Sequence, residues 1–194
     1  YQAASGAGQS GIDALREQIL AVAGTTAGEA TGDVRKHVKD SGPFPAPLAL
    51  NVVPWAGSLK EDGHTSEELK VRNESRKILG LPRLKVSATC VRVPVLTTHS
   101  LAVHATFKNE VTRKGAQKLL EKAAGVTLLD DPENKKFPTP NDAVGTDATW
   151  VGRVRRSPDD KKSLDLFLCG DNLRKGAALN TAQIAELLAV ELTK

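Results

Sequence analysis

Two apolar segments, residues 149–154 and 164–169, constrain the fold of this sequence more than any other feature. The loop between them holds about eight residues, whereas a crossover between parallel strands needs a dozen or more. If both segments are strands, they must therefore pair in an antiparallel manner. Helical patterns recur between the other strand-like segments, which is typical of layered folds. The sequence therefore predicts an α/β (α+β) fold, in which a mixed, largely antiparallel sheet carries helices on one face.

Local patterns predict the remaining elements. Apolar residues at helical spacing predict helices over residues 10–23, 65–79, 111–124 and 172–192. Short apolar runs predict further strands over residues 48–53, 86–96, 101–107 and 126–129. Residues 24–47 are rich in Gly, Thr and Pro, which predicts a long loop. At Thr65 the sequence Thr-Ser-Glu-Glu has the form of a capping box and marks a helix start.

Composition limits the classes of partner. The chain has 194 residues, 40% of them hydrophobic and 26% charged, which is typical of a globular domain that buries a core. The formal net charge is only +4, and two Trp, one Tyr and four Phe are few for a nucleic-acid surface of stacking rings. No apolar run approaches a transmembrane helix in length, and no secretory signal precedes the first helix. We therefore expect neither a nucleic-acid partner nor a membrane span.

The two cysteines, Cys90 and Cys169, lie in strand-like apolar segments. This placement indicates reduced core thiols rather than a disulfide framework or a zinc site, so we expect no metal and a cytoplasmic location. The sequence contains no methionine and begins at Tyr1, from which we expect it to be part of a longer chain.

The segment ATCVRVPVLTTHS, residues 88–100, places an arginine inside an apolar run and a histidine seven residues later. Strand alternation predicts that Arg92 points away from the valines on either side of it, and so away from the core. Arg92 either pairs with a structural carboxylate or holds a substrate carboxylate or phosphate in its planar fork. His99 lies in a predicted turn between strands, where it is either an ordinary turn histidine or a general acid–base group.

The predicted helix 65–79 has a charged face opposite its apolar stripe, formed by Glu67, Lys70, Glu74 and Lys77. These residues either form a solvated ladder of ion pairs or line a cleft. In the second case Glu67 is suited to an ammonium group and Lys70 to a phosphate.

The predicted final helix carries an apolar stripe that needs a surface to pack against. The stripe consists of Leu173, Ala177, Ile184, Leu187, Leu188 and Leu192. Asn172, Arg174 and Lys175 crowd its first turn, where unsatisfied backbone N–H groups favour anions and amides.

Five segments, in this order, carry a resemblance to a known family: YQAASGAG, EELKVRNESRKILG, TCVRVPVLTTHS, VGRVRR and GDNLRKGAALNTAQIAELL. Together they resemble the carboxyl-terminal part of the aspartate-β-semialdehyde dehydrogenases. The resemblance covers essentially the whole chain except residues 24–44 and 130–145. It implies an NADP-dependent oxidoreductase of lysine, threonine and methionine biosynthesis, which interconverts L-aspartyl-4-phosphate and L-aspartate-4-semialdehyde.

The resemblance also implies roles for individual residues. His99 matches the general acid–base histidine, and Arg92 the arginine that binds the substrate carboxylate. Gln2 matches a glutamine that orients the substrate, Glu67 a glutamate that contacts it, and Lys70 a lysine that binds phosphate.

For the cofactor NADP, the resemblance implies contacts by Ser5, Gly6 and Asn172. It places the dinucleotide-binding domain and the nucleophilic cysteine outside this chain. Residues 1–194 are therefore expected to form a single substrate-binding and dimerisation domain, similar to that of glyceraldehyde-3-phosphate dehydrogenases. Alone, such a chain is expected to bind NADP weakly, to be inactive, and to form a homodimer. The final helix is expected to pack on the dinucleotide domain.

Two alternatives stay open at this point. The chain could be a non-catalytic, stand-alone dimerisation module. It could also be a relative of N-acetyl-γ-glutamyl-phosphate reductase, in which the amino group of the substrate is acylated. The second alternative leaves Glu67 without an ammonium partner, so the sequence favours the aspartate enzyme.

Overall fold

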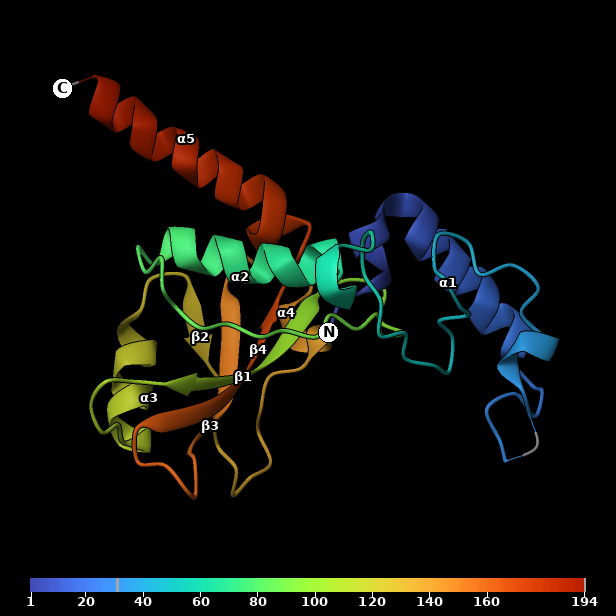
Figure 1. The fold of residues 1–194 in the computed structure, drawn as a ribbon, viewed down its shortest axis with the longest axis horizontal. Coiled ribbons are helices and arrows are strands. Elements are labelled where there is room, and N and C mark those ends of the chain that lie inside the picture. The colour runs from blue at the N-terminus through green and yellow to red at the C-terminus, as the bar shows by residue number, and fades with distance from the viewer. Residues whose placement is uncertain (31, 194) are drawn as a thin grey trace. The chain divides into compact units, whose positions relative to one another are not determined.

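The computed structural model describes residues 1–30 and 32–193 and shows two compact units, Tyr1–Leu96 and Thr97–Lys194 (Figure 1). Thr31, which falls in the predicted loop, lies outside the described residues. The two units differ in secondary structure, because the four-stranded sheet lies entirely in the second.

The first unit is built on helices and irregular chain. Its elements are η1 (Ala4–Ala7), α1 (Gly8–Val22), η2 (Val34–Lys36), η3 (Glu61–Gly63) and α2 (Ser66–Ile78). One face of α1 packs into a hydrophobic core with side chains of the following loop, and this core contains Ala4, Leu15, Val22, Ala27, Val38, Phe44, Leu48, Ala49 and Val53. The core therefore forms between a helix and segments without regular structure.

The predicted helices of this unit are confirmed in α1 and α2. The capping box is present at the start of α2, where Glu68 Oε2 accepts a hydrogen bond from the Thr65 N–H at 2.8 Å. The apolar stripe predicted on this helix is not buried, however: no residue of α2 is buried, and Ile78 is 79% exposed.

The strands predicted over residues 48–53 and 86–96 are wrong. The described structure holds only isolated bridges there, from Arg92 to Gln2 in parallel and to Val53 in antiparallel manner. Pro94 interrupts the second run and Pro54 directly follows the first, and the chain turns tightly around each proline. The N–H of Val95 bonds to the carbonyl of Val93 across Pro94 at 2.8 Å, and the same turn surrounds Pro54. Proline fixes φ and donates no hydrogen bond, so a ladder cannot continue through it.

The second unit contains the sheet. Its strands are β1 (His99–Thr106), β2 (Val126–Leu128), β3 (Thr149–Arg156) and β4 (Ser163–Gly170), in the spatial order β1-β4-β3-β2. The pairs β1–β4 and β3–β4 are antiparallel, and β2–β3 is parallel. The helices are α3 (Arg113–Lys122), α4 (Pro140–Ala143), η4 (Arg174–Ala178) and α5 (Leu179–Leu192). The predicted mixed, largely antiparallel sheet with helices is confirmed, including the antiparallel pairing deduced from the short loop.

Two details of the sheet escape the sequence patterns. β1 begins at His99, two residues before the predicted start, with Gly170 as its partner in the register. The register between β3 and β4 shifts after Gly152, at a bulge where Arg153 has a φ of 53°. Gly152 is a close approach: a Cβ there would collide with the carbonyl oxygen of Leu129 and with the Pro138 ring.

The carboxyl-terminal helix starts at Arg174 rather than at 172, first as a π-helical turn and then as α5. None of the residues in α5 is buried. The predicted stripe is exposed, with Leu187 at 72% and Leu188 at 56%. In the part of the chain that the structure describes, no helix combines the length and apolar character needed to cross a bilayer.

Candidate functional site

Arg92 is a buried cation that the backbone anchors on two sides. Only 8% of the residue is exposed, and its Nη1 donates a hydrogen bond to the carbonyl oxygen of Ala3 at 2.9 Å. Its backbone N–H and C=O both pair with Val53, at 2.8 and 3.0 Å. Its neighbours Val91 and Val93 are only half-buried, so the prediction that Arg92 points away from the core is wrong. Its guanidinium bonds instead to the carbonyl of Ala3, a fully buried residue.

The charge of Arg92 is compensated only in part by its neighbours. Among residues 1–30 and 32–193, no carboxylate forms a salt bridge with it. Burial lowers the pKa of the Arg92 guanidinium, and the neighbouring Glu67 carboxylate acts in the opposite direction. A guanidinium stays protonated in proteins even so. A buried cation with incomplete local compensation is suited to an anionic ligand.

A cavity lies beside this cation. Its volume is about 370 Å³, and Arg92 contributes to its lining together with Ala7, Gly42, Pro43, Phe44, Pro45, Trp55, Ala56 and Gly57. The walls are mostly apolar, and Arg92 is the charged residue among them. A concave, mostly apolar site with one convergent charged group is the usual form of a small-molecule pocket.

The amino-terminal residues of the chain are tied to the Arg92 segment by backbone hydrogen bonds. The N–H of Gln2 bonds to the carbonyl of Val91 at 2.8 Å, and that of Ser5 to the carbonyl of Leu96 at 2.9 Å. Ser5 is buried and Gly6 is exposed. The structure therefore brings Gln2 beside Arg92, as the sequence-based hypothesis requires.

The first turns of α2 supply two carboxylates, Glu67 and Glu68, to the surroundings of the Arg92 segment. Glu67 forms an ion pair with Lys70, with 3.1 Å between Oε2 and Nζ, and both side chains are partly exposed. Glu67–Lys70 is the pair of the charged face that the structure shows, and it leaves both interpretations of that face open. Glu68 has a different role: its Oε1 accepts a hydrogen bond from the Cys90 N–H at 3.1 Å, which ties α2 to the Arg92 segment.

Neither cysteine is arranged as a nucleophile. Both are free and buried, as predicted for reduced thiols. Burial raises the pKa of Cys90, and the carboxylates of Glu68 and Glu67 raise it further. Burial also raises the pKa of Cys169, against a smaller lowering by a contact with Ser100. A nucleophilic cysteine needs the thiolate, which a lowered pKa provides.

His99 lies in the second unit, at the first position of β1, and is half-buried. The residue before it, Thr98, is buried and has a φ of 88°. The backbone N–H of Thr98 donates a hydrogen bond to the side-chain oxygen of Asn172 at 2.9 Å. Asn172 is thus bonded to Thr98, the residue directly before His99, so the structure places these two predicted site residues close together.

The predicted site residues therefore form two groups, one in each unit. The first group holds Gln2, Ser5, Gly6, Glu67, Lys70 and Arg92, and the second holds His99 and Asn172. Among the described residues no group of three or more His, Cys, Asp or Glu side chains is arranged to hold a metal ion.

Sequence reasoning missed Glu68 in the first unit, and Thr98 and Asp171 in the second. Glu68 is visible in the sequence only as part of a capping box, and its bond to Cys90 spans 22 residues. Asp171 could have been identified, because an Asp just before a helix is a common N-cap. No local pattern reveals the positive φ of Thr98, since β-branched residues rarely adopt it.

Residues 1–175 match the family described as the semialdehyde dehydrogenase dimerisation domain. The match covers most of the chain, so the chain belongs to this family.

Curated relatives agree. The chain is 50% identical over 192 residues to an aspartate-semialdehyde dehydrogenase of Corynebacterium melassecola. This match covers 97% of this chain and 54% of that protein. It is 47% identical over 199 residues to the enzyme of Streptomyces akiyoshiensis, with 99% of this chain and 56% of that protein covered. The chain thus spans about half the length of the curated relatives that it matches.

A solved structure supports the same assignment. The chain is similar to the crystal structure of aspartate semialdehyde dehydrogenase II from Vibrio cholerae, described as complexed with ASA, at a TM-score of 0.86 and 35% identity. That match covers 97% of this chain and 52% of the other. A structure from Candida albicans, described with NADP, shares the fold at a TM-score of 0.63 and 23% identity.

Proposed function

We propose that the protein carrying this chain interconverts L-aspartyl-4-phosphate and L-aspartate-4-semialdehyde, with NADPH in one direction and with NADP and phosphate in the other. The observation that carries the proposal is the buried Arg92 cation at the cavity, which forms no salt bridge among the described residues, in a chain of this family. The similarity to a Vibrio cholerae structure described with ASA supports it. The pathway expected for this reaction is lysine, threonine and methionine biosynthesis.

Arg92 binds the substrate carboxylate in this proposal. A guanidinium presents parallel N–H donors that match the two oxygens of a carboxylate, and burial removes competing water. The anchoring of its Nη1 on Ala3 and of its backbone on Val53 fixes the direction of the fork. Such preorganisation places the reacting carbon without ordering a flexible side chain at each turnover.

Gln2, Glu67 and Lys70 complete the substrate contacts. Gln2 is held beside Arg92 by the parallel bridge, so its side chain is available to orient the substrate. Glu67 lies near enough to Arg92 to affect its pKa, and it is suited to the substrate ammonium. Lys70, 3.1 Å from Glu67, is suited to the phosphate as a compact cation.

His99 acts as the general acid–base group in this proposal. It takes a proton from the attacking thiol and returns it to the leaving group. Cys90 and Cys169 do not fit the nucleophile, because both are buried and the pKa of each is raised. We therefore propose that the thiol comes from a part of the protein outside this sequence, and that this chain alone is inactive.

Ser5, Gly6 and Asn172 are the residues of this chain that contact NADP in this proposal. When bound, NADPH would supply a hydride in one direction, and NADP would accept one in the other. Gly6 is exposed and has no side chain, which suits a close approach of the cofactor. The N–H groups of Ser5 and Gly6 bond within the chain, and Asn172 Oδ1 holds Thr98. These residues fit van der Waals contacts to NADP, with its main binding site elsewhere in the protein.

We propose that the homodimer forms on the apolar side of β1, where Leu101 is exposed and Val103 and Ala105 are half-buried. Alternation places Leu101, Val103 and Ala105 on one side of the strand, and Leu101 is 46% exposed. The occupant is a second copy of the chain, because the matched family is described as a dimerisation domain. Leu101→Asp should convert the dimer to monomer in sedimentation, since a charge in an apolar interface is left unpaired. Leu119→Asp on the exposed side of α3, 74% exposed, is the control that should leave the dimer intact.

Two finer assignments follow from the same proposal. The exposed apolar residues of α5 dock on the dinucleotide domain, which the family resemblance places outside this sequence. The free, buried thiols of Cys90 and Cys169 support a cytoplasmic location.

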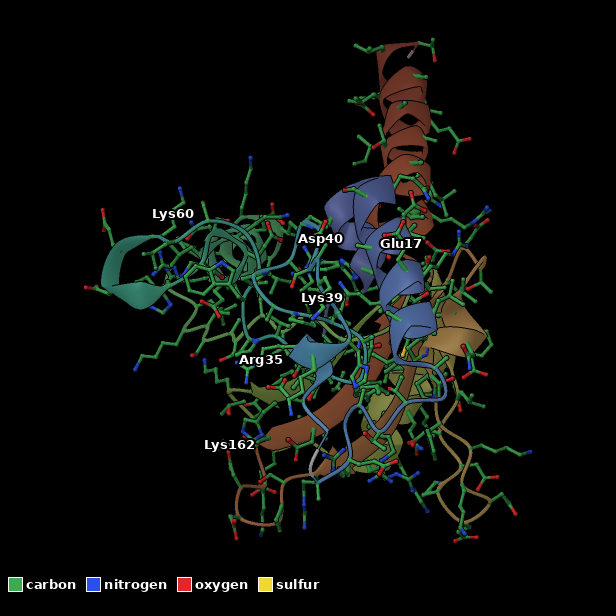
Figure 2. All side chains as sticks on the ribbon, turned by 90° about the vertical axis from the view of Figure 1, so that its right-hand side faces the viewer. Glu17, Arg35, Lys39, Asp40, Lys60 and Lys162 are labelled. Atoms are coloured by element: carbon green, nitrogen blue, oxygen red, sulfur yellow. The ribbon has the colours of Figure 1, made fainter. Side chains whose placement is uncertain are left out.

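The test uses the whole protein that contains this chain, assayed for phosphate-dependent reduction of NADP. Wild type should oxidise L-aspartate-4-semialdehyde, and Arg92→Lys should lower kcat/KM roughly hundredfold, because a point charge cannot replace the fork. Arg35→Lys is the control, since Arg35 projects from η2 and pairs only with nearby Asp33 among the described residues (Figure 2). Circular dichroism of both variants separates a loss of binding from a loss of fold.

Other outcomes identify the alternatives. A preference of the wild type for N-acetyl-L-glutamate semialdehyde would assign the protein to the acetylated substrate, and Glu67→Gln should then have little effect. Absence of activity on both substrates, together with a stable dimer, would support the non-catalytic module.

A further inference from the structure

The turn before His99 holds a backbone conformation that its residue disfavours. Thr98 has a φ of 88°, in the left-handed region that favours glycine, and only 1% of the residue is exposed. Its Oγ1 is buried and has no hydrogen-bond partner among the described residues. A β-branched residue in this conformation persists only when the surrounding structure fixes it.

Asn172 supplies that fixation. Its Oδ1 accepts a hydrogen bond from the Thr98 N–H at 2.9 Å, across a separation of 74 residues. The sheet explains how they meet, because His99 pairs with Gly170 in the register of β1 and β4. Asn172 thus lies just beyond the end of β4, beside the start of β1.

A buried carboxylate in turn fixes Asn172. Asp171 is only 4% exposed and uses both of its side-chain oxygens on backbone N–H groups. Oδ1 accepts from Leu173 at 2.9 Å and from Arg174 at 3.2 Å, and Oδ2 accepts from Gly145 at 2.8 Å. Asp171 therefore connects the turn that carries Asn172 both to the start of the terminal helix and to the loop before β3.

We propose that Asn172 is a positioning residue for His99, which acts by holding Thr98 at positive φ, with Asp171 as its support. The backbone reversal at Thr98 sets the direction in which the first residue of β1 presents its side chain. This inference rests on the proposed function, in which His99 moves the proton. It gives Asn172 a role distinct from the cofactor contact that the resemblance implies.

Three variants of the whole enzyme test the role. Asn172→Ala removes the acceptor, so Thr98 relaxes and kcat falls roughly 10- to 100-fold, as expected for a misplaced catalytic group. The limb of the pH profile of kcat that reports the acid–base group should move as well, while KM for NADP changes less than about twofold. In the Thr98→Gly variant, glycine adopts the positive φ without needing the hydrogen bond from Asn172. In that background, Asn172→Ala should therefore cost much less activity.

Asn172→Asp is the conservative variant. A carboxylate oxygen still accepts from the Thr98 N–H, so kcat on the plateau of the pH profile should recover most of the loss. Asn109→Ala, which changes an exposed asparagine in the same unit, is the control and should match wild type.

The results separate the inference from the proposed function. Unchanged kcat and pH profile in Asn172→Ala, or a large rise in KM for NADP alone, would overturn the positioning role. If the wild type does not oxidise aspartate semialdehyde at all, the proposed function is wrong. The catalytic role of the Asn172–Thr98 hydrogen bond is then wrong as well. Hydrogen exchange then tests separately whether Asn172 holds Thr98. The Thr98 amide should be protected in wild type and should exchange at least tenfold faster in Asn172→Ala.

Discussion

Arg92 and His99 are fixed by different means, and the difference explains much about this chain. Arg92 lies in a segment without regular structure, anchored by isolated bridges to Gln2 and Val53 and by a side-chain bond to Ala3. His99 opens a strand that pairs with β4 along eight consecutive residues of each. A ladder fixes a residue through many similar bonds, whereas the Arg92 segment depends on a few individual ones. Single substitutions should therefore affect the two units unequally.

The first unit has a polar residue at its centre. Gln18 is only 2% exposed and lies on α1, facing the irregular chain. Its Oε1 accepts from the N–H groups of Leu48 at 2.7 Å and Ala49 at 3.1 Å, and its Nε2 donates to the Ser41 carbonyl at 3.3 Å. One side chain thus satisfies backbone groups that a strand ladder would otherwise satisfy.

Gln18→Leu should have the largest effect on stability. It leaves two buried N–H groups without acceptors, which costs about 2–5 kcal/mol of the free energy of unfolding. Urea unfolding of the whole protein measures the loss. Gln9→Leu, at an exposed glutamine whose bond to Asp13 is local, is the matched control. A loss of less than about 1 kcal/mol in the free energy of unfolding would show that the first unit does not depend on its individual side-chain hydrogen bonds.

Gly152→Ala tests the sheet of the second unit. A Cβ at this position would collide with the Leu129 carbonyl and the Pro138 ring, so the backbone of β3 must shift. Such overpacking costs about 1–3 kcal/mol. Gly170→Ala is the control within the same sheet, because the nearest atom to a Cβ there is 3.9 Å away. Equal melting temperatures for the two variants would contradict the close approach at Gly152.

Glu68→Gln should have the smallest effect, and that effect should depend on pH. Hydrogen bonds from the N–H groups of Thr65 and Cys90 lower the pKa of Glu68 from its usual 4.5. Because the pKa is lower in the folded protein, the carboxylate stabilises the fold above pH 4.5 and loses this contribution as the pH falls through the folded value. The variant should cost about 1 kcal/mol at neutral pH.

The measurement is the free energy of unfolding of wild type and Glu68→Gln between neutral and acid pH. The difference between the two curves should shrink toward acid pH. Glu74→Gln, at an exposed glutamate of the same helix, is the control. A difference that stays constant with pH would contradict the role of the Glu68 charge.

Periodicity was sufficient for the elements whose pattern is long. It predicted α1, α2, α3 and the strands β1, β3 and β4 to within a few residues. In the helices the pattern reflects hydrogen bonds between near neighbours in the sequence. In the strands it reflects pairing with a neighbouring strand that no proline interrupts. The run over residues 86–96 is apolar enough for a strand, yet it forms only the bridges at Arg92. Pairing of a strand depends on its partners, which lie far away in the sequence.

The same reason limits what the sequence could predict about the candidate site. Residue types and the family resemblance pointed to Arg92, His99 and Asn172. They did not reveal that Arg92 is buried, because alternation gives a face but not which face is covered. Nor did they reveal the bond of Asn172 to Thr98, since no local rule links residues 74 positions apart.

By itself, the sequence determined the helices, the antiparallel pairing of β3 with β4, and membership in a family whose curated relatives are about twice as long. Those features depend on local spacing, on a loop too short for a crossover, and on residues that can be compared one by one. Only the tertiary structure decided that Arg92 is a buried cation without a salt bridge in the described part of the chain, and that Asp171 and Asn172 hold Thr98 at positive φ. Burial and strain are properties of what surrounds a residue, and distant parts of the chain supply those surroundings.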